Sequence, residues 1–362
     1  MMARAAGPSR HPTMFAALLC GMLLLLTVAC GCGETAAPVR SGTTPSSTSV
    51  QSPSTQHVAW PDDGATDRPV AAAGCGLAPP VAPGASAQQS VAVNPAAAAG
   101  YTTRSYIIHV PSGYVPTHPI PLLLDFHGGG GTAAGTARSS GFSALADQRG
   151  FLAVYPQGLP YDALGAGYTT WAATGPLDTL TNGVDERLFV SDLLDALQRR
   201  YCVDPARIYA TGFSAGGAMV AFLTCTLAGR FAAFAPMSGD AYVLPGGCHP
   251  SHPTSIIEFH GSADAGEPYA GSPGPKDAVY RRQGVLEWLS AWAARDGCAT
   301  APTAILQTTA VMAEQWTGCR DGTGLVHYLV FGLGHSWPPP IAGQDARDLI
   351  WAFFLAHPLQ GT

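Results

Sequence analysis

The stretch "RIYATGFSAGGAM", Arg207 to Met219, joins an apolar, β-rich run to a segment with the composition of a helix. Ser214 stands at the junction, between Gly212 and Gly216, in the pattern Gly-x-Ser-x-Gly. Glycine at both positions indicates a turn so tight that a side chain would collide with neighbouring backbone. A serine in such a strand–turn–helix junction is strained and holds its hydroxyl clear of the sheet. The stretch therefore predicts a nucleophilic serine at the end of a strand.

Strand-like and helix-like segments alternate on both sides of this turn. Apolar, β-rich runs predict strands at residues 104–110, 121–127, 151–156, 207–212, 231–237, 255–261 and 326–332. Helical spacing predicts helices at residues 184–201, 215–227, 281–296 and 345–357. Alternation of this kind is typical of an α/β protein, with a mostly parallel sheet and helices on both faces. In such sheets functional residues gather at the carboxyl ends of the strands.

A serine hydroxyl needs a base within hydrogen-bond reach and a carboxylate that orients the base. "HGSADAGEPY" places Asp264 just after one predicted strand, and "GLGHSWP" places His335 just after another. Both fall at the strand edge expected for Ser214, in the chain order Ser, Asp, His. The sequence therefore predicts the catalytic residues Ser214, Asp264 and His335, with Glu267 and Asp321 left as alternatives for the acid.

A glycine-rich loop follows a predicted strand. The run "HGGGG", which begins at His127, can bring backbone amides close to a substrate oxygen because its glycines carry no side chains. Gly128 and Gly129 are the expected donors of an oxyanion hole, together with the amide of Ala215 at the start of the helix behind the serine. His127 itself, like His260, ends a strand before a glycine, and we interpret both histidines as structural.

Three aromatic residues are candidates for a substrate pocket. Tyr168 and Trp171 belong to a glycine-rich segment that can form a pocket wall, and Trp337 lies beside the predicted base in "GLGHSWP". Large aromatic side chains stack on planar substrates, but they fill cores equally often. We expect these three residues to line the substrate site, with core packing as the alternative.

Four stretches together resemble one family of secreted enzymes. The stretches are "VDPARIYATGFSAGGAM", "FAAFAPMSG", "HGSADAGEPYAG" and "GLGHSWP". Their combination is similar to the polyhydroxybutyrate depolymerase and feruloyl esterase-like family of serine esterases, from about Cys75 to the C-terminus. The resemblance implies the α/β-hydrolase fold and hydrolysis of feruloyl, acetyl or hydroxyalkanoate esters through an acyl-enzyme, with no metal or organic cofactor. It also implies the same roles for Ser214, Asp264 and His335.

Two further residues agree with this family, and three features of the sequence differ from it. Asp185 and Trp171 fall at positions similar to the family's helix-start aspartate and site-lining tryptophan. Glu267 stands where members usually carry an apolar residue, and "HGGGG" replaces a less glycine-rich loop. We expect no separate substrate-binding domain of the kind found in many polymer-degrading members. A serine peptidase on the same fold and a catalytically retired binding lipoprotein are the alternative functions.

Residues 1–32 have the composition of a signal peptide. The apolar run from Met14 to Ala29 follows two arginines and is short for a membrane span. It ends in "LTVACGC", which resembles a bacterial lipobox, so we expect lipidation at Cys30, with Cys32 as the fallback and plain cleavage as the alternative. Residues 33–74 are rich in Ser, Thr and Pro, which predicts a flexible linker before a catalytic domain at 75–362. The expected location is extracellular or in the cell envelope.

Six cysteines of the predicted catalytic domain favour three disulfides, because an exported chain matures in an oxidising compartment. The closure of short loops favours Cys225 with Cys248 and Cys298 with Cys319, which leaves Cys75 for Cys202. A zinc site at "CHPSH" would lack well-spaced further ligands, so we expect no metal.

Composition limits the possible partners. The chain has 24 acidic and 18 basic residues, a net charge of −6, and no basic cluster of the kind that binds nucleic acid. Hydrophobic residues make up 47% and charged residues 12%, as in compact globular proteins. The expected partner is therefore a small or polymer-derived ester, with no nucleic acid and with membrane contact only through an N-terminal lipid anchor.

Overall fold

The computed structural model describes residues 67–94, 100–161, 166–173, 184–239, 241–244, 246–273 and 281–360. The predicted signal peptide and the lipidation candidates Cys30 and Cys32 lie outside the described residues. The strands are β1 Ser86–Ala92, β2 Thr103–His109, β3 Ile120–Phe126, β4 Leu152–Pro156, β5 Leu159–Pro160, β6 Thr169–Thr170, β7 Val203–Phe213, β8 Ala233–Met237, β9 Ala241–Tyr242, β10 Ser255–Gly261, β11 Arg282–Gln283, β12 Thr303–Gln307, β13 Val311–Trp316 and β14 Leu325–Val330. The helices are α1 Ala133–Ser139, α2 Phe142–Arg149, α3 Glu186–Arg200, α4 Ala215–Thr226, α5 Val285–Arg295 and α6 Ala346–Ala356.

One large sheet of ten strands organises the molecule, in the order β1-β2-β4-β3-β7-β8-β10-β14-β13-β12. The central strands β4, β3, β7, β8, β10 and β14 pair in parallel. At the two sides of the sheet, β1, β2, β13 and β12 add antiparallel pairs. Parallel strands need both faces covered, and their sequences are correspondingly rich in apolar residues. Strand β4, for example, is buried at every residue.

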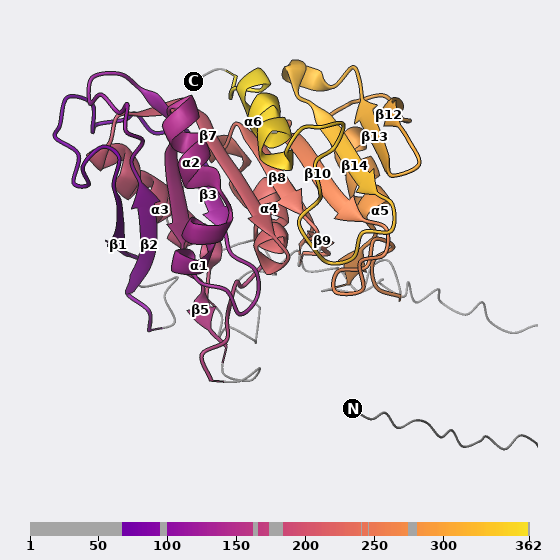
Figure 1. The fold of residues 1–362 in the computed structure, drawn as a ribbon, viewed down its shortest axis with the longest axis horizontal. Helices are drawn as coiled ribbons and strands as arrows, with labels where there is room; N and C mark the ends of the chain where they lie inside the picture. Colours follow the sequence, from indigo (N-terminus) through magenta and orange to yellow (C-terminus); the bar gives the residue numbers. More distant parts are fainter. Residues whose placement is uncertain are drawn as a thin grey trace, which may run out of the picture. The chain divides into compact units, whose positions relative to one another are not determined.

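Helices cover both faces of this sheet (Figure 1). Successive side chains of a strand point to opposite faces. Leu122 and Leu124 of β3 therefore pack with α3 and α4, while Leu123 packs on the other face with α1, α2 and α6. Helix α5 lies on the α4 side, against Ile256 of β10 and Leu325 of β14. The predicted α/β fold with a mostly parallel sheet is confirmed.

The predicted elements and the observed ones differ mainly at the sides of the sheet. All seven predicted strands and all four predicted helices are present within a few residues of their expected limits. The antiparallel strands β1, β12 and β13 were not predicted, nor were the short helices α1 and α2. Strands β1 and β12 are largely exposed and carry polar residues, so they lack the apolar run that marks a buried strand.

The end of the predicted linker packs against the catalytic part of the chain. The Gly74 amide donates to the backbone oxygen of Gln198 at 2.9 Å, and the Gly229 amide donates to the Asp67 carboxylate at 2.5 Å.

Asp185 caps helix α3, where its carboxylate accepts hydrogen bonds from the amides of Arg187 and Leu188. None of the helices in the described part of the chain has the length and apolar character that a membrane crossing requires.

The three disulfides have the predicted pairing, Cys75–Cys202, Cys225–Cys248 and Cys298–Cys319. Their sequence separations are 127, 23 and 21 residues. In the chain-entropy account a longer closed loop restricts the unfolded chain more. The Cys75–Cys202 bridge is therefore the one expected to stabilise the fold most.

This ranking can be measured by urea unfolding of paired Cys→Ser variants. Replacing both Cys75 and Cys202 is expected to lower the free energy of unfolding by about 5 kcal/mol, against about 3 kcal/mol for Cys298 and Cys319 together. Intact-mass analysis after native alkylation should find no free thiol among the six cysteines. An equal loss in the two paired variants would contradict the chain-entropy ranking.

Candidate active site

Ser214 occupies a strained turn between β7 and α4. Its backbone has φ 59° and ψ −126°, a positive φ that side-chain-bearing residues rarely adopt. The Ser214 amide donates to the backbone oxygen of Met237 at the end of β8, at 3.0 Å, which ties the turn to the neighbouring strand. The serine is thus presented at the carboxyl edge of the parallel sheet, as the sequence predicted.

The two flanking glycines permit this turn. A Cβ at Gly216 would overlap the carbonyl oxygen of Phe126, and a Cβ at Gly212 would come within 2.6 Å of the carbonyl group of Gly216. Both contacts are with backbone, which cannot move aside as a flexible side chain can. The expectation that side chains at these positions would collide with backbone is confirmed.

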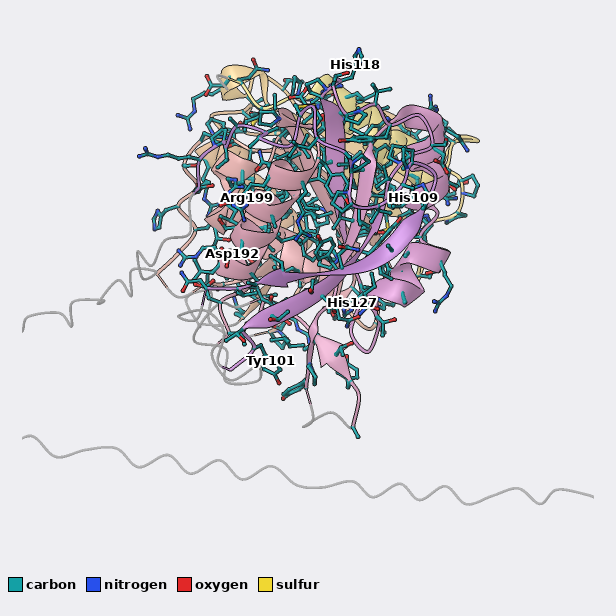
Figure 2. The ribbon with its side chains drawn as sticks, turned by 90° about the vertical axis from the view of Figure 1, so that its left-hand side faces the viewer. Tyr101, His109, His118, His127, Asp192 and Arg199 are labelled. Carbon is teal, nitrogen blue, oxygen red and sulfur yellow. A yellow bond between two sulfur atoms is a disulfide. The ribbon has the colours of Figure 1, made fainter. Side chains whose placement is uncertain are left out.

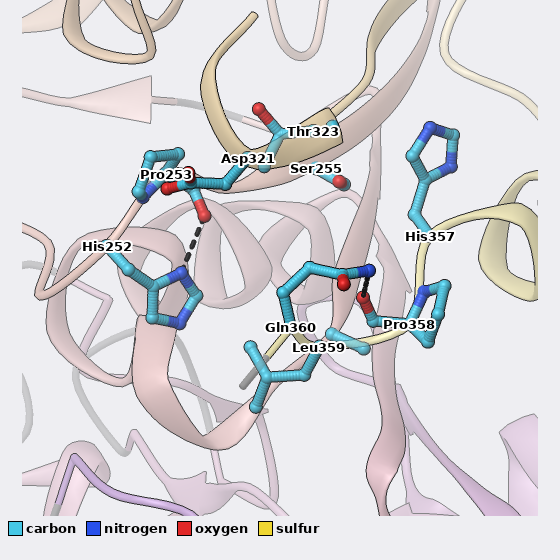
Figure 3. A pocket seen from close by; sticks show the side chains of 11 residues that line it. His252, Pro253, Ser255, Asp321, Thr323, His357, Pro358, Leu359 and Gln360 are labelled. Atoms are coloured by element: carbon cyan, nitrogen blue, oxygen red, sulfur yellow. Dashed lines mark hydrogen bonds between the residues drawn. The ribbon is translucent and has the colours of Figure 1, made fainter. Parts of the chain in front are cut away.

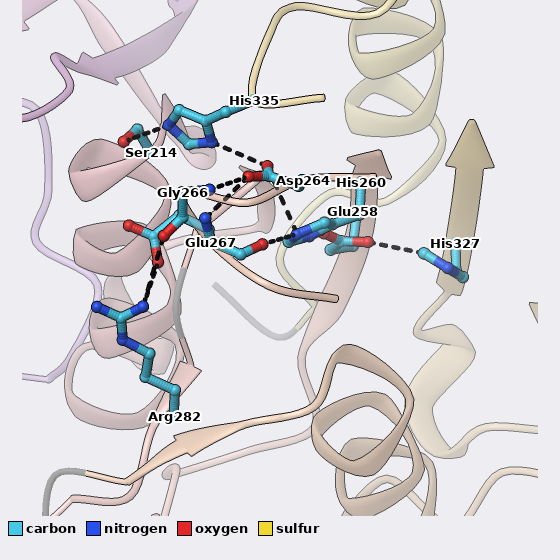
Figure 4. A network of polar contacts seen from close by, with 9 residues as sticks. All are labelled: Ser214, Glu258, His260, Asp264, Gly266, Glu267, Arg282, His327 and His335. Carbon is cyan, nitrogen blue, oxygen red and sulfur yellow. Dashed lines mark hydrogen bonds and ion pairs between the residues drawn. The ribbon is translucent and has the colours of Figure 1, made fainter. Parts of the chain in front are cut away.

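A continuous chain of hydrogen bonds links Ser214, His335 and Asp264 (Figure 4). The Ser214 Oγ lies 2.8 Å from His335 Nε2, and His335 Nδ1 lies 2.8 Å from Asp264 Oδ2. Because an ionised carboxylate only accepts, Nδ1 carries the proton and Nε2 is left to accept from the serine hydroxyl. The imidazole is 29% exposed, whereas the Asp264 side chain is completely buried.

The environment of Asp264 favours its ionised form. Its Oδ1 accepts hydrogen bonds from the amides of Gly266 at 2.9 Å and Glu267 at 2.8 Å. Burial alone would raise the pKa of this carboxyl, but the Glu267 amide, the His335 hydrogen bond and the nearby histidine charges together hold its pKa below the ordinary value. The group facing His335 is therefore a carboxylate at neutral pH.

The two alternative acids lie elsewhere. The Glu267 carboxylate is directed toward Arg282, with 3.7 Å between Glu267 Oε2 and Arg282 Nη1 (Figure 4). Asp321 precedes β14, whereas His335 follows it, so the two lie at opposite ends of that strand. Of the three candidates, the structure brings Asp264 to His335.

The glycine-rich loop lies directly beside Ser214. The Cα of Gly128 is so placed that an added Cβ would meet Ser214 Cβ at 3.4 Å. The carbonyl of Gly128 accepts from His127 Nδ1 at 2.8 Å and from the Gly131 amide at 2.9 Å. The peptide bonds of the described residues are trans, so the Gly129 amide points opposite to the Gly128 carbonyl. The loop thus directs the Gly129 N–H out of its own turn.

His127, labelled in Figure 2, anchors this loop. Its hydrogen bonds select a single tautomer. Its Nε2 accepts from the Gly158 amide at 2.9 Å, which leaves Nδ1–H to donate to Gly128. Burial lowers the pKa of this imidazole, so it is neutral. The interpretation of His127 as structural agrees with these contacts. Gly158 and Thr169, which also support the loop, were not predicted, because isolated loop residues carry no sequence pattern.

The three predicted substrate-lining aromatics have different positions. Trp171 is 4% exposed, and its indole N–H donates to the backbone oxygen of His127 at 2.8 Å. Tyr168 is half-buried and packs over Gly129 and Gly130. Trp337 is half-buried and meets the ring of Phe142 edge-on, with 6.4 Å between centroids. Trp171 therefore supports the loop from inside, whereas Tyr168 and Trp337 retain surface beside the site.

A separate cavity of about 450 Å³ opens at the other end of the strands (Figure 3). Its lining includes Ser255, the first residue of β10, and Asp321 to Thr323 before β14. The imidazole of His252, which also lines it, contacts the backbone oxygen of Pro253 at 2.6 Å. Among the described residues, no group of three or more His, Cys, Asp or Glu side chains could hold a metal ion.

In a comparison with protein families, residues 104–261 match the family model Esterase PHB depolymerase. Residues 104–261 belong to this family. The predicted resemblance is thereby confirmed for this segment. The matched segment includes the serine turn, the glycine-rich loop and strands β3 to β10, but ends before Asp264 and His335.

Three relatives of this chain have names that indicate different ester substrates. The bifunctional acetylxylan esterase/xylanase of Neocallimastix patriciarum is 27% identical, over 72% of this chain and 35% of its own length. Feruloyl esterase B of Piromyces equi is 30% identical, over 64% and 42%. Poly(3-hydroxyalkanoate) depolymerase C of Paucimonas lemoignei is 28% identical, over 68% and 62%. The chain thus spans less than two thirds of the length of each of these three relatives.

Among solved structures, the acetyl xylan esterase from Aspergillus awamori resembles this chain with a TM-score of 0.54. The likeness covers 74% of this chain and 99% of that one at 20% sequence identity, and it supports the α/β-hydrolase fold.

Proposed function

We propose that this chain is a serine carboxylic-ester hydrolase that acts through an acyl-enzyme. The observation that carries the proposal is the chain of hydrogen bonds from Ser214 Oγ through His335 to the buried carboxylate of Asp264. A serine at positive φ, beside a neutral base of defined tautomer, is the arrangement that acyl transfer requires. An intact arrangement of this kind argues against a catalytically retired binding protein.

The reaction begins when His335 Nε2 takes the proton of the Ser214 hydroxyl as Oγ attacks the ester carbonyl carbon. Asp264 holds the Nδ1–H and stabilises the imidazolium that forms. Collapse of the tetrahedral intermediate breaks the C–O bond of the ester, and the alcohol leaves with the proton from Nε2. Water then attacks the acyl-enzyme with the same base, releases the acid and restores the Ser214 hydroxyl.

Backbone amides stabilise the tetrahedral oxyanion in this proposal. The Gly129 N–H points out of the glycine loop, and the Ala215 N–H lies at the start of α4, where the helix dipole favours negative charge. Gly128 lies closest to Ser214 and completes the set of donors. The indole of Trp171 and the imidazole of His127 keep these amides in place through their hydrogen bonds to the loop.

The proposed substrates are feruloyl, acetyl or hydroxyalkanoate esters. The names of the relatives support this range, because they include an acetylxylan esterase, a feruloyl esterase and a poly(3-hydroxyalkanoate) depolymerase. The half-buried rings of Tyr168 and Trp337 favour a planar aryl acid within it. Stacking of this kind contributes about 0.5 to 1.5 kcal/mol beyond area burial, or roughly tenfold in specificity at most.

The substrate proposal is tested by kcat/KM for methyl ferulate, a short aliphatic ester and an amide analogue of the ferulate. We expect methyl ferulate to be hydrolysed fastest, and Trp337→Ala to reduce its advantage over the aliphatic ester by roughly threefold to tenfold. Phe331→Ala, at an exposed aromatic residue on the same loop, is the matched control and should leave the ratio unchanged. Equal rates for both esters would remove the aryl preference, and faster amide cleavage would indicate a peptidase.

The proposal includes export of the chain and its attachment to a membrane by lipid. Residues 1–32 are proposed as a signal peptide with lipidation at Cys30, followed by a linker at 33–74 and the catalytic domain at 75–362. Three disulfides support an oxidising compartment. In a bacterial host Cys30→Ser is expected to move the protein from the membrane fraction to the soluble fraction, whereas Cys32→Ser should not. Membrane retention of the Cys30 variant would contradict the anchor at this residue.

A further inference from the structure

A second polar cluster lies buried behind Asp264 (Figure 4). It consists of Glu258 and His260 from β10 and His327 from the neighbouring strand β14. The exposed fractions of these three side chains are 4%, 1% and 0%. Ionisable groups are seldom buried so completely without a partner, because burial penalises their charged forms. The protonation of this cluster is therefore set by its own hydrogen bonds.

The Glu258 carboxylate bridges the two histidines. Its Oε1 lies 3.0 Å from His260 Nδ1, and its Oε2 lies 2.7 Å from His327 Nδ1. The other nitrogen of His327 lies 2.9 Å from the hydroxyl of Tyr269, which can donate a proton to it. His327 therefore satisfies all its contacts as a neutral imidazole that donates from Nδ1 and accepts at Nε2.

His260 differs from His327, because its hydrogen-bond contacts within the described part of the chain include no donor such as the Tyr269 hydroxyl. Its Nε2 lies 2.7 Å from the backbone oxygen of Glu267, which can only accept, and 3.8 Å from Asp264 Oδ2. Its Nδ1 faces the carboxylate of Glu258. Both ring nitrogens thus face oxygen acceptors, so both carry protons while Glu258 is ionised.

Electrostatics agree with this geometry. Burial alone would lower the pKa of His260, but the hydrogen bond and charge of Glu258, with Asp264 beyond, raise it above the ordinary value. Burial alone would raise the pKa of Glu258, but the hydrogen bonds from His260 and His327 and the charge of His260 lower it. Each partner therefore stabilises the charged form of the other.

We propose that His260 is a positioning residue: a buried imidazolium, paired with Glu258, that supports the turn carrying Asp264 and opposes positive charge on His335. The inference rests on the proposed ester hydrolysis. His260 Nε2 and His335 Nδ1 approach the same Asp264 oxygen, at 3.8 and 2.8 Å. A positive charge held there opposes a second positive charge on His335.

The direction of the effect depends on the charges that surround His260. The Glu258 charge acts against the effect but is further from Asp264 than His260 is, because it lies on the other side of the imidazole. Further groups on the packed elements are His327 and its cross-strand neighbour Glu314, the Tyr269 ring, and the Glu267–Arg282 pair. Removal of the imidazolium is expected to move the acid limb of the kcat/KM profile to higher pH.

The charge on His260 can be observed directly in the unmodified protein. Long-range ¹H–¹⁵N spectra of the histidine side chains distinguish imidazolium from either neutral tautomer. One of the 11 histidine side chains, that of His260, is expected to remain an imidazolium at pH values above the ordinary histidine range. The resonance is assigned by its absence in His260→Gln or, if that variant does not fold, in His260→Asn. A neutral His260 at pH 7 would overturn the inference.

The pH profile supplies the functional test. His260→Gln is expected to shift the acid limb of kcat/KM upward by about 0.5 to 1 pH unit. The matched control is His109→Gln, because His109 is also buried beside a carboxylate, 3.2 Å from Asp147. His109 is far from the cluster, since its strand β2 is separated from β10 by β4, β3, β7 and β8. An acid limb that does not move in His260→Gln would overturn the inference. A general loss of activity with an unshifted profile would indicate a merely structural role.

Failure of the proposed function would look different. A parent protein that hydrolyses no ester, or a Ser214→Ala variant as active as the parent, would refute ester hydrolysis through Ser214. The spectroscopic test of the His260 charge does not depend on turnover, so it decides that part of the inference separately.

Discussion

Replacement of Ser214 by alanine is expected to lower kcat for ester hydrolysis by on the order of 10⁴-fold to 10⁶-fold. The hydroxyl is the atom that forms the acyl bond in the proposed mechanism, and no neighbouring group can substitute for it as a nucleophile. The fold should be unaffected, because the Ser214 backbone amide still donates to Met237 and alanine has the smallest side chain above glycine. The measurement is kcat for a chromogenic acetate ester, with the melting temperature determined in parallel.

A fluorophosphonate probe gives the independent measurement. It should label the parent protein at Ser214 and leave Ser214→Ala unlabelled. Ser139→Ala is a suitable control, because Ser139 lies at the exposed end of α1 and donates only to a backbone oxygen of its own helix. Labelling at another serine, or activity of Ser214→Ala near that of the parent, would refute the assignment.

Asp264→Asn is expected to reduce kcat by about 10³-fold to 10⁴-fold. An asparagine amide can donate to His335 Nδ1, which would place the ring proton on Nε2. The imidazole then cannot accept the Ser214 proton. The side-chain oxygen of the introduced asparagine can still accept from the amides of Gly266 and Glu267, so the turn should remain folded. The measurement is kcat for the same chromogenic ester.

Glu267→Gln is the matched control for this prediction. Glu267 lies in the same turn and was the sequence-based alternative for the acid, but its carboxylate faces Arg282. Loss of that partly exposed ion pair should change kcat by less than about threefold. A large loss in Glu267→Gln with a small loss in Asp264→Asn would exchange the proposed roles of the two acids.

Much of the fold and of the candidate site was predictable because it depends on short, contiguous patterns. Gly212 and Gly216 are required by backbone contacts within one turn, so their spacing reveals the turn directly. The parallel strands are buried on both faces and therefore carry apolar runs that stand out from the surrounding sequence. The closure of short loops favoured the observed pairing of the cysteines without excluding the other connectivities. By contrast, the exposed strands β1 and β12 pack mainly through backbone hydrogen bonds, which leave little trace in composition.

The aromatic residues show where contiguous patterns stop being informative. The sequence gives Trp171 and Trp337 the same expected role, yet the structure buries Trp171 beneath the glycine loop and leaves Trp337 partly exposed beside His335. The difference arises from the position of His127, whose carbonyl lies within reach of the Trp171 indole. No pattern around either tryptophan encodes that distance.

The sequence by itself determined the strand–turn–helix at Ser214 and the α/β class, and it favoured one disulfide pairing and one set of catalytic residues among alternatives. Only the tertiary structure decided which carboxylate meets His335, because Asp264 and Glu267 share one turn and differ in the direction of their side chains. It also decided the surroundings of His260, whose contacts come from Glu258 on its own strand and from the loop that follows. Chain order places residues at a strand end, but protonation and hydrogen bonding depend on distances of a few ångströms between side chains, and these are set by packing.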